Sequence, residues 1–217
     1  MKKHYLSEKN SILNHFLGQI RNINIHNDSM RFRRNIERIG EIIAYEISKN
    51  LQYKNIEIQT PLAIKRTTEI ENQLVLCSIL RAGLPLHLGF LNYFDHAENG
   101  FVSAYRHHPN NDDYFEILVE YQAVAAIENK TLILVDSMLA TGQSILAVFN
   151  KLIQKGLPKE IHIAVIIAAP EGVAYLEEHL PDYCHLWIAD LDEKLNDKKY
   201  IFPGLGDAGD LAFGNKL

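Results

Sequence analysis

Apolar residues recur at helical spacing in the segment that follows residue 28. Five of them fall on one face of a helix: Phe32, Ile36, Ile39, Ile43 and Ile47. Ser29 can cap this helix at its amino end, and the pattern predicts that it runs to about Asn50. The opposite face is charged, and we interpret it as a solvated or subunit-facing surface rather than an RNA-binding one. Its charged residues are Arg31, Arg33, Arg34, Glu37, Arg38 and Glu41.

Short, continuous apolar runs rich in branched residues occur three times, at 74–80, 131–135 and 161–168. This composition is typical of strands that are covered on both faces, as in a parallel sheet. A helix is predicted after each run, and the three helices span 85–94, 143–155 and 171–179. Because strand and helix alternate, the pattern predicts an α/β fold with a mainly parallel sheet flanked by helices on both sides.

Three further segments have a strand-like pattern. Ile56 and Ile58 alternate with polar residues in a predicted half-buried strand that ends near Thr60. Residues 100–106 and 114–121 predict two strands joined by the polar residues 107–113, and we interpret this pair as a β-hairpin arm. No repeat, low-complexity tract or linker interrupts the sequence, so we expect one domain over residues 1–217.

Composition and charge exclude several classes of function. The chain is 47% hydrophobic and 23% charged, as in ordinary globular proteins, and its apolar runs are too short to span a membrane. A net charge of -5 disfavours a protein that neutralises nucleic-acid phosphates over a broad face. Cys77 and Cys184 lie in apolar stretches, as buried free thiols do, and the first residues lack a secretion signal. We therefore expect a cytoplasmic protein.

The residues after the second apolar run form the first candidate site, because ligands of such sheets collect at the carboxyl ends of the strands. The run ends in Asp136 and passes through small residues into a helix, with Thr141 and Ser144 near its start. Free backbone N–H groups, the helix dipole and two hydroxyls suit a phosphate monoester, while Asp136 can accept hydrogen bonds from a sugar. Local chemistry permits a capped turn with a solvated Asp136 equally well.

A second candidate site follows the first apolar run, where Arg81 precedes Gly83. Arg81 can clamp an anionic leaving group or form a surface ion pair, and Arg106 near the end of another predicted strand offers a further cation. The segment 204–209 spells G-x-G-x-x-G, but it lies too close to the end of the chain for a dinucleotide fingerprint. We interpret it as a loop whose backbone contacts a ligand. The sequence has neither a P-loop nor a zinc-binding pattern, so no metal site built by the protein itself is indicated.

These stretches together resemble the uracil phosphoribosyltransferase family. Residues 135–142 look like the family's motif for phosphoribosyl pyrophosphate (PRPP), which usually reads Asp-Pro-Met-Leu-Ala-Thr-Gly. Residues 79–84, 168–172 and 203–210 also match, in the family's order, and the similarity spans roughly residues 31–214. Two departures concern the PRPP motif, where Ser137 replaces the usual proline and Gln143 a usual glycine.

The resemblance implies a type I phosphoribosyltransferase core with a small C-terminal hood, and an arm that normally serves dimer contacts. It implies catalytic roles for Asp136, Arg81 and Arg106 in the transfer of the 5-phosphoribosyl group from PRPP to uracil, which yields UMP and pyrophosphate. PRPP binding is implied for these three residues, for Asp207, and for Ser137, Met138, Leu139, Ala140, Thr141, Gly142, Gln143 and Ser144. Uracil recognition is implied for Ile201, Gly206, Asp207 and Ala208.

The resemblance also implies Mg²⁺ as cofactor, held through PRPP and water near Asp207 rather than directly by the protein. A homodimer or higher homo-oligomer is implied, with GTP as a candidate effector. Two alternatives share the fold. A pyrimidine-sensing regulator that binds RNA would need a basic face. A purine phosphoribosyltransferase commonly has two adjacent acids where this chain has Asp136 and Ser137, and it lacks the glycine-rich C-terminal loop.

Overall fold

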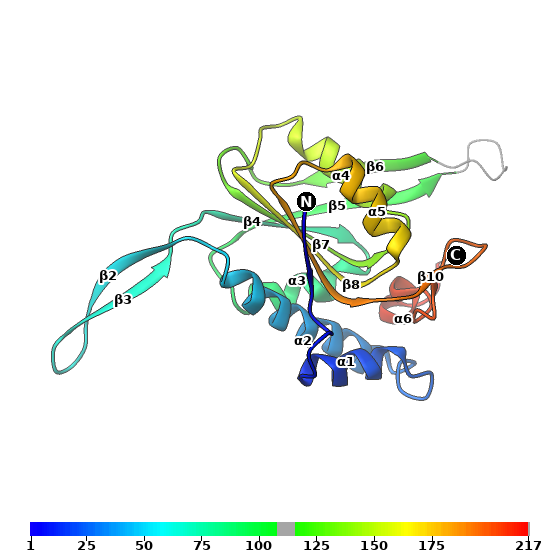
Figure 1. Cartoon of the computed structure of the whole chain (residues 1–217), viewed down its shortest axis with the longest axis horizontal. Helices are drawn as coiled ribbons and strands as arrows, with labels where there is room; N and C mark the ends of the chain where they lie inside the picture. The colour runs from blue at the N-terminus through cyan, green and yellow to red at the C-terminus, as the bar shows by residue number, and fades with distance from the viewer. Residues whose placement is uncertain (108–115, 217) are drawn as a thin grey trace.

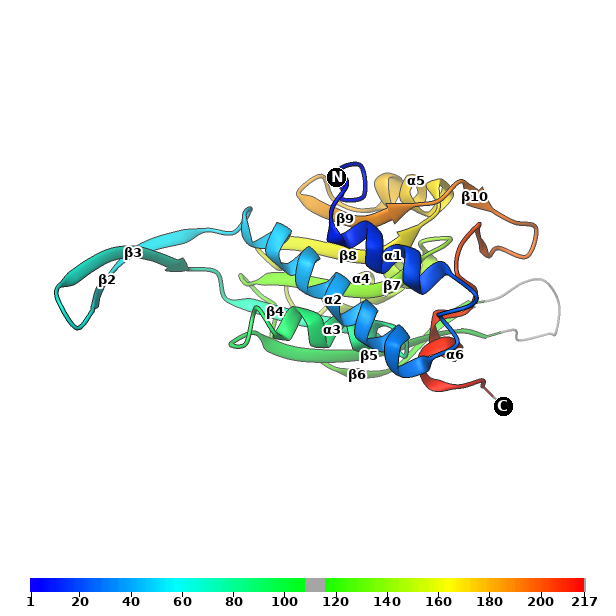
Figure 2. The same ribbon diagram turned by 90° about the horizontal axis from the view of Figure 1, so that it is seen from below.

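The computed structural model of the chain describes residues 1–107 and 116–216, and the side chains of 1–104 and 117–216. A seven-stranded sheet with the order β1-β9-β8-β7-β4-β5-β6 forms its centre (Figures 1 and 2). All neighbouring strands in it run parallel except β5 and β6. The mainly parallel sheet is thus confirmed. The strands are β1 (Lys2–Tyr5), β4 (Leu74–Leu80), β5 (Glu98–His107), β6 (Glu116–Ala123), β7 (Thr131–Leu139), β8 (Glu160–Ala168) and β9 (Cys184–Leu191).

Helices cover both faces of this sheet, as the alternating pattern predicted. One face packs against α1 (Ile12–Arg21), α2 (Ser29–Ser48), α3 (Gly83–Leu91) and the short α6 (Ala208–Phe213). The other face packs against α4 (Gln143–Ile153) and α5 (Pro170–His179). Each face therefore has its own apolar core, and the central strands β4, β7, β8 and β9 are mostly buried between the two cores. Within the described ranges, no helix combines the length and the apolar character that a membrane crossing needs.

The helix predicted after residue 28 is α2, and its five-residue apolar stripe is at most 1% exposed. Its cap differs from the prediction, because Asp28 rather than Ser29 accepts the hydrogen bond from the N–H of Arg31, at 3.0 Å. The elements before it were not predicted. In α1, Ser11 and Asn14 form a capping box, and β1 pairs with β9 although its sequence is polar.

The predicted hairpin is confirmed, because β5 and β6 pair in antiparallel orientation, but it belongs to the main sheet instead of forming a separate arm. β5 lies beside β4 and carries β6 on its other side, so residues 98–107 and 116–123 form the edge of the main sheet. The connecting residues 108–113 lie outside the described residues. The projecting hairpin is β2 (Tyr53–Gln59) with β3 (Ile64–Ile70), a separate antiparallel sheet that extends from the body (Figure 1). Because no layer covers it, β2 is exposed at six of its seven positions rather than half-buried.

Two cysteines and one histidine show how burial changes titration in this core. Cys77 and Cys184 are buried free thiols, as expected, and burial raises their pKa values to about 12 and about 11. His4 in β1 stacks on Trp187 with ring centroids 3.7 Å apart, and its Nε2 lies 3.1 Å from His185 Nδ1. Burial, followed by the neighbouring His185, lowers the pKa of His4 to about 4. β1 is therefore held by a neutral His4.

Acid should loosen this strand. The unfolded chain protonates His4 near pH 6.5, whereas the folded chain does so only near pH 4. The free energy of unfolding should therefore fall by up to about 3 kcal/mol between pH 6.5 and pH 4. His4→Phe keeps a ring on Trp187 but cannot titrate, so urea unfolding at a series of pH values should show a flatter dependence. An unchanged dependence would contradict this assignment.

Candidate active site

The two candidate stretches meet at the carboxyl edge of the sheet. β4 leads through α3 to β5 on one side, and β7 leads through α4 to β8 on the other, so the strand order reverses between β4 and β7. Ligands of doubly wound sheets bind at such a reversal. Residues 81–83 directly follow β4, and residues 136–142 form the last part of β7 and the loop after it. They are in close contact, since a Cβ added to Gly83 would lie 3.7 Å from the Cα of Asp136.

Asp136 is held within β7 rather than in a turn. The strand was predicted to end at Val135 but continues to Leu139, because Asp136, Met138 and Leu139 pair with β8. Burial raises the pKa of Asp136 to about 7, although the N–H groups of Ser137 and Met138 donate to its carboxyl and act in the opposite direction. A proline in place of Ser137 would lack this donor. Asp136 is half-buried and so remains accessible to a ligand.

The loop Ala140–Thr141–Gly142 leads into α4 without a protein cap. Gly142 is the N-cap residue, with φ +81°, and no side chain in the described part of the chain caps the first turn. The Ser137 hydroxyl and Gln143 Oε1 are buried and have no hydrogen-bond partner among the described residues. Uncapped N–H groups beside the unpaired Ser137 hydroxyl, which can donate, fit an anion such as a phosphate. The side chain of Leu139 lies in the apolar core, so only its backbone is available to a ligand.

Gly172 fixes the position of this loop. A Cβ on Gly172 would lie 2.3 Å from the Ala140 carbonyl oxygen, so α5 and the loop are packed backbone to backbone. Gly172 belongs to the third stretch that resembles the family, to which sequence analysis assigned no role. Its role here is to let α5 approach the loop closely.

Gly172→Ala should therefore displace the loop and weaken PRPP binding by about tenfold or more, because a fraction of an ångström matters in a preorganised site. Gly18→Ala is the matched control, since a Cβ on Gly18 in α1 has nothing within 4 Å. The dissociation constant for PRPP, measured by calorimetry with Mg²⁺ present, gives the answer. Equal affinity in the two variants would show that the loop tolerates the displacement.

Arg81 contacts the C-terminal hood. Its Nη2 lies 2.7 Å from Asp210 Oδ1, its Nη1 donates to the Gly214 carbonyl at 3.2 Å, and its Nε is buried without a partner. The ion-pair alternative for Arg81 is thus realised, and its Nε has no partner among the described residues. Arg106 lies in β5 opposite Ile117, and its side chain lies outside the described part of the structure.

The glycine-rich segment is a loop over residues 203–207, between a short strand and a short helix that begins at Ala208. Ile201 begins β11 (Ile201–Phe202), which pairs with β10 (Lys194–Leu195). Gly204 and Gly206 have φ +65° and +95°, which favour glycine, and Asp207 caps α6 by accepting from the N–H of Asp210. Ala208 is the first residue of α6 and is buried. A cavity of about 360 Å³ lies against residues 205–207.

The N-terminal segment also contributes residues to this region, and no sequence pattern indicated them. His26 and Ser29 line the same cavity as residues 205–207. Arg21, at the end of α1, donates to the Gly204 carbonyl and pairs with Asp190 and Asp192 at the end of β9. The helical spacing of Leu13, Leu17 and Ile20 could have placed Arg21 on a helix. No local pattern, however, indicates partners 169 to 183 positions away.

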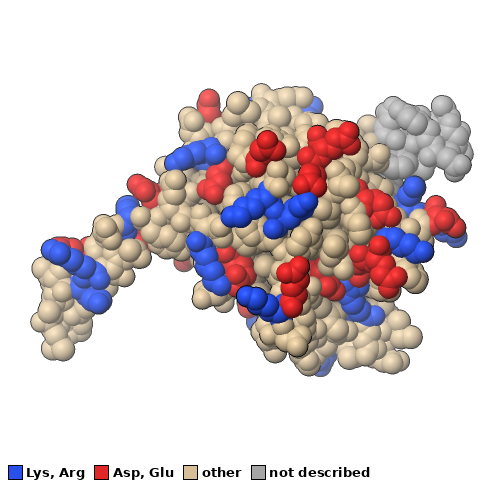
Figure 3. Space-filling view, in the orientation of Figure 1, with Lys and Arg blue, Asp and Glu red and all other residues tan. Residues whose placement is uncertain are grey.

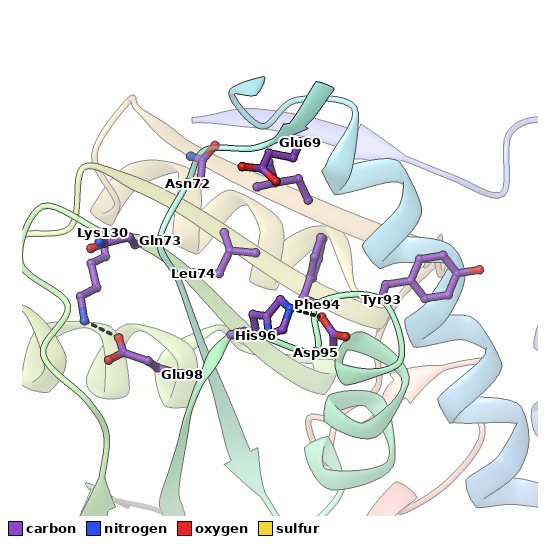
Figure 4. A pocket seen from close by; sticks show the side chains of 12 residues that line it. Glu69, Asn72, Gln73, Leu74, Tyr93, Phe94, Asp95, His96, Glu98 and Lys130 are labelled. Atoms are coloured by element: carbon purple, nitrogen blue, oxygen red, sulfur yellow. Dashed lines mark hydrogen bonds and ion pairs between the residues drawn. The ribbon is translucent and has the colours of Figure 1, made fainter. Parts of the chain in front are cut away.

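Another cavity, of about 550 Å³, lies at the opposite, amino edge of the sheet (Figure 4). Leu74 begins β4 there, Glu98 begins β5, and Lys130 directly precedes β7. Lys130 is paired with Glu98, and His96 lies beside Asp95. The cavity contains none of the residues that sequence analysis selected, and the candidate active site is the carboxyl edge.

The family model and the sequence relatives agree on one family. A family model described as uracil phosphoribosyltransferase matches residues 7–215. A uracil phosphoribosyltransferase of Porphyromonas gingivalis is 49% identical, and the match covers 98% of each chain. A solved structure of an Aquifex aeolicus protein superposes with a TM-score of 0.86 at 28% identity, covering 97% of this chain and 98% of that one. A purine phosphoribosyltransferase of Pyrococcus horikoshii, 13% identical with a TM-score of 0.51 over 89% of this chain and 90% of that one, shares the fold.

Proposed function

Because the chain belongs to the uracil phosphoribosyltransferase family and transfers the 5-phosphoribosyl group of PRPP to uracil, we propose a specific role for each group at the carboxyl edge. The uncapped start of α4 holds the 5-phosphate, through residues 140–144. Asp136 accepts hydrogen bonds from the ribose hydroxyls. The observation that carries this proposal is the close approach of Gly83 to Asp136, which brings the turn containing Arg81 to the same end of the sheet as Asp136.

The chemistry requires charge stabilisation rather than a covalent nucleophile. Breaking the bond between the anomeric carbon and pyrophosphate builds oxocarbenium-like charge on the ribose and negative charge on the leaving group. Arg81 and Arg106 stabilise the leaving pyrophosphate, and the unused Nε of Arg81 is a donor available for it. Asp136 holds the ribose so that the uracil nitrogen can attack in line.

Mg²⁺ fits this site as a partner of the substrate. Asp207 and Asp136 offer carboxylate oxygens, the hard donors that Mg²⁺ prefers, and the described residues contain no cluster of three or more metal-ligating side chains. We propose that Asp207 reaches the ion through water while the PRPP oxygens bind it directly. When bound, Mg²⁺ neutralises charge on the pyrophosphate.

Uracil is recognised by the hood. Gly204 and Gly206 fix a turn in which backbone groups of Ile201, Gly206, Asp207 and Ala208 can face a flat base. Because backbone donors and acceptors have fixed directions, such a turn can distinguish one pyrimidine from another. This assignment rests on the resemblance and on the position of the hood beside Arg81.

The two alternatives find no support. An RNA-binding regulator needs a basic face, but the net charge is -5, and acidic and basic side chains are interspersed on the face in Figure 3. For a purine phosphoribosyltransferase, the likeness is limited to the fold.

We further propose a homo-oligomer in the cytoplasm. On the β2–β3 arm, Leu62 is 95% and Ile64 is 64% exposed in the single chain, as expected for a surface that a second copy covers. The buried free thiols support a reducing compartment. GTP activation stays a prediction from the resemblance.

The activity itself is tested with the purified chain, radiolabelled uracil, PRPP and Mg²⁺. UMP and pyrophosphate should form in equal amounts, and their formation should require both substrates. RNA binding that is independent of uracil, without UMP formation, would support the regulator instead.

A further inference from the structure

Arg21 is the most extensively paired cation described outside the proposed catalytic groups. Its Nη2 lies 2.7 Å from Asp190 Oδ2 and 2.8 Å from Asp192 Oδ1. Its Nη1 donates to Asp192 Oδ2 at 2.9 Å and to the Gly204 carbonyl at 3.0 Å. The Arg21 side chain is 19% exposed and that of Asp192 only 6%. A guanidinium with four such contacts is locked in one orientation.

The network holds Gly204 from both sides. Asp192 Oδ2 accepts a hydrogen bond from the N–H of Gly204 at 3.1 Å, and Arg21 Nη1 donates one to the Gly204 carbonyl oxygen. The backbone N–H of Asp192 donates to Ala168 at the end of β8, so the anchor is tied to the sheet. The turn before Gly204 is tight as well, because a Cβ there would lie 2.2 Å from the Ile201 carbonyl oxygen. The position of Gly204 is therefore coupled to that of Ile201, and Gly206 follows two residues later in the same loop.

We propose that Arg21 is a positioning residue for the pyrimidine: through Asp192 and Gly204 it holds the turn that carries the base-binding backbone groups. This inference rests on the proposed role of residues 201–208 in uracil recognition. Among the described residues, the hydrogen-bond partners of Arg21 are Asp190, Asp192 and Gly204, and none of these belongs to the phosphate loop. Its effect should thus fall on uracil and spare PRPP.

Arg21→Lys is the informative variant. Lysine keeps the positive charge but lacks the planar fork, so one ammonium cannot satisfy both carboxylates and the carbonyl together. The KM for uracil should rise about tenfold, while the KM for PRPP changes less than about twofold. Arg38→Lys is the matched control, because Arg38 contacts Asn35 and Phe16 between α1 and α2 and not the turn.

Hydrogen exchange provides a readout that does not depend on activity. In Arg21→Lys, amides of residues 200–207 should exchange about tenfold faster, with β7 unchanged, and Arg38→Lys should leave both segments as they are. Unchanged exchange at 200–207, or an equal rise in both KM values, would overturn the positioning role. If the unaltered chain made no UMP, the proposed function would fail, and the exchange experiment would still decide whether Arg21 holds the turn.

Discussion

Asp136→Asn is expected to lower kcat by about 10²-fold or more while the fold becomes more stable. The loss of rate follows because the carboxylate contributes contacts to the ribose that strengthen as charge develops in the transition state. Asparagine keeps an oxygen that can accept from the N–H groups of Ser137 and Met138, so the end of β7 should keep its shape. Steady-state kinetics with PRPP and uracil measure the loss.

The gain in stability follows from the raised pKa of Asp136. The folded chain releases this proton near pH 7, whereas the unfolded chain releases it near 3.8. Between these values the folded state binds more protons, so the contribution of Asp136 to stability falls as pH rises and the full penalty applies above pH 7. Removing the charge should raise the free energy of unfolding by about 2–4 kcal/mol at pH 8 and by little at pH 4.

Asp95→Asn provides the control for both measurements, since Asp95 is exposed at the amino edge of the sheet. Its kinetics and stability should match those of the unaltered chain. Near-normal kcat in Asp136→Asn would remove Asp136 from the sugar site, and a loss of stability at pH 8 would contradict the raised pKa.

Uracil should be preferred over cytosine by roughly 10⁴-fold in kcat/KM. Uracil has an acceptor at O4 and a donor at N3, and cytosine reverses both. If the N–H of Gly206 meets O4 and a carbonyl of the Ile201 turn meets N3–H, cytosine leaves buried polar groups facing like partners. Each mismatch costs about 1–3 kcal/mol, and a site built on hydrogen bonds can reject an analogue by about 10⁴-fold.

The source of this selectivity can be tested at Ile201. Its side chain is buried in the core, so Ile201→Val removes one methyl group without touching the backbone. The ratio of the two specificity constants should barely change. A ratio within about tenfold for the unaltered chain would contradict backbone recognition, and a large change in Ile201→Val would assign the selectivity to the side chain.

The sheet could be predicted from sequence because its central strands are buried on both faces and their apolar runs are continuous. The ligand edge followed from the same pattern, since parallel strands bring Arg81 and Asp136 to one side. The Arg81–Gly83 contact with Asp136, and the uncapped start of α4, agree with that expectation. The roles of individual residues, and a single domain over the chain, stay predictions.

What sequence patterns missed has physical causes. β1 is a polar edge strand, so alternation does not reveal it, and β3 is exposed along most of its length and therefore has no buried face to mark it. The position of the arm was not predicted because β5 and β6 do form a hairpin, and their local pattern does not show that β5 also pairs with β4. The end of β7 was predicted too early because Asp136 and Ser137 interrupt the apolar run. The strand continues past them because its backbone pairs with β8.

The contact between Arg21 and Gly204 has a consequence for how the chain acquires its shape. It joins residues 183 positions apart, and β1 likewise can pair only after β9 has been synthesised. Contacts of such long range form late, because the entropy of closing the intervening chain must be overcome first. During synthesis from the amino end, the central strands have left the ribosome before the hood exists. We therefore expect the turn proposed to bind the base to assemble last, and a chain that stops short of residue 204 to have most of a core but no such turn.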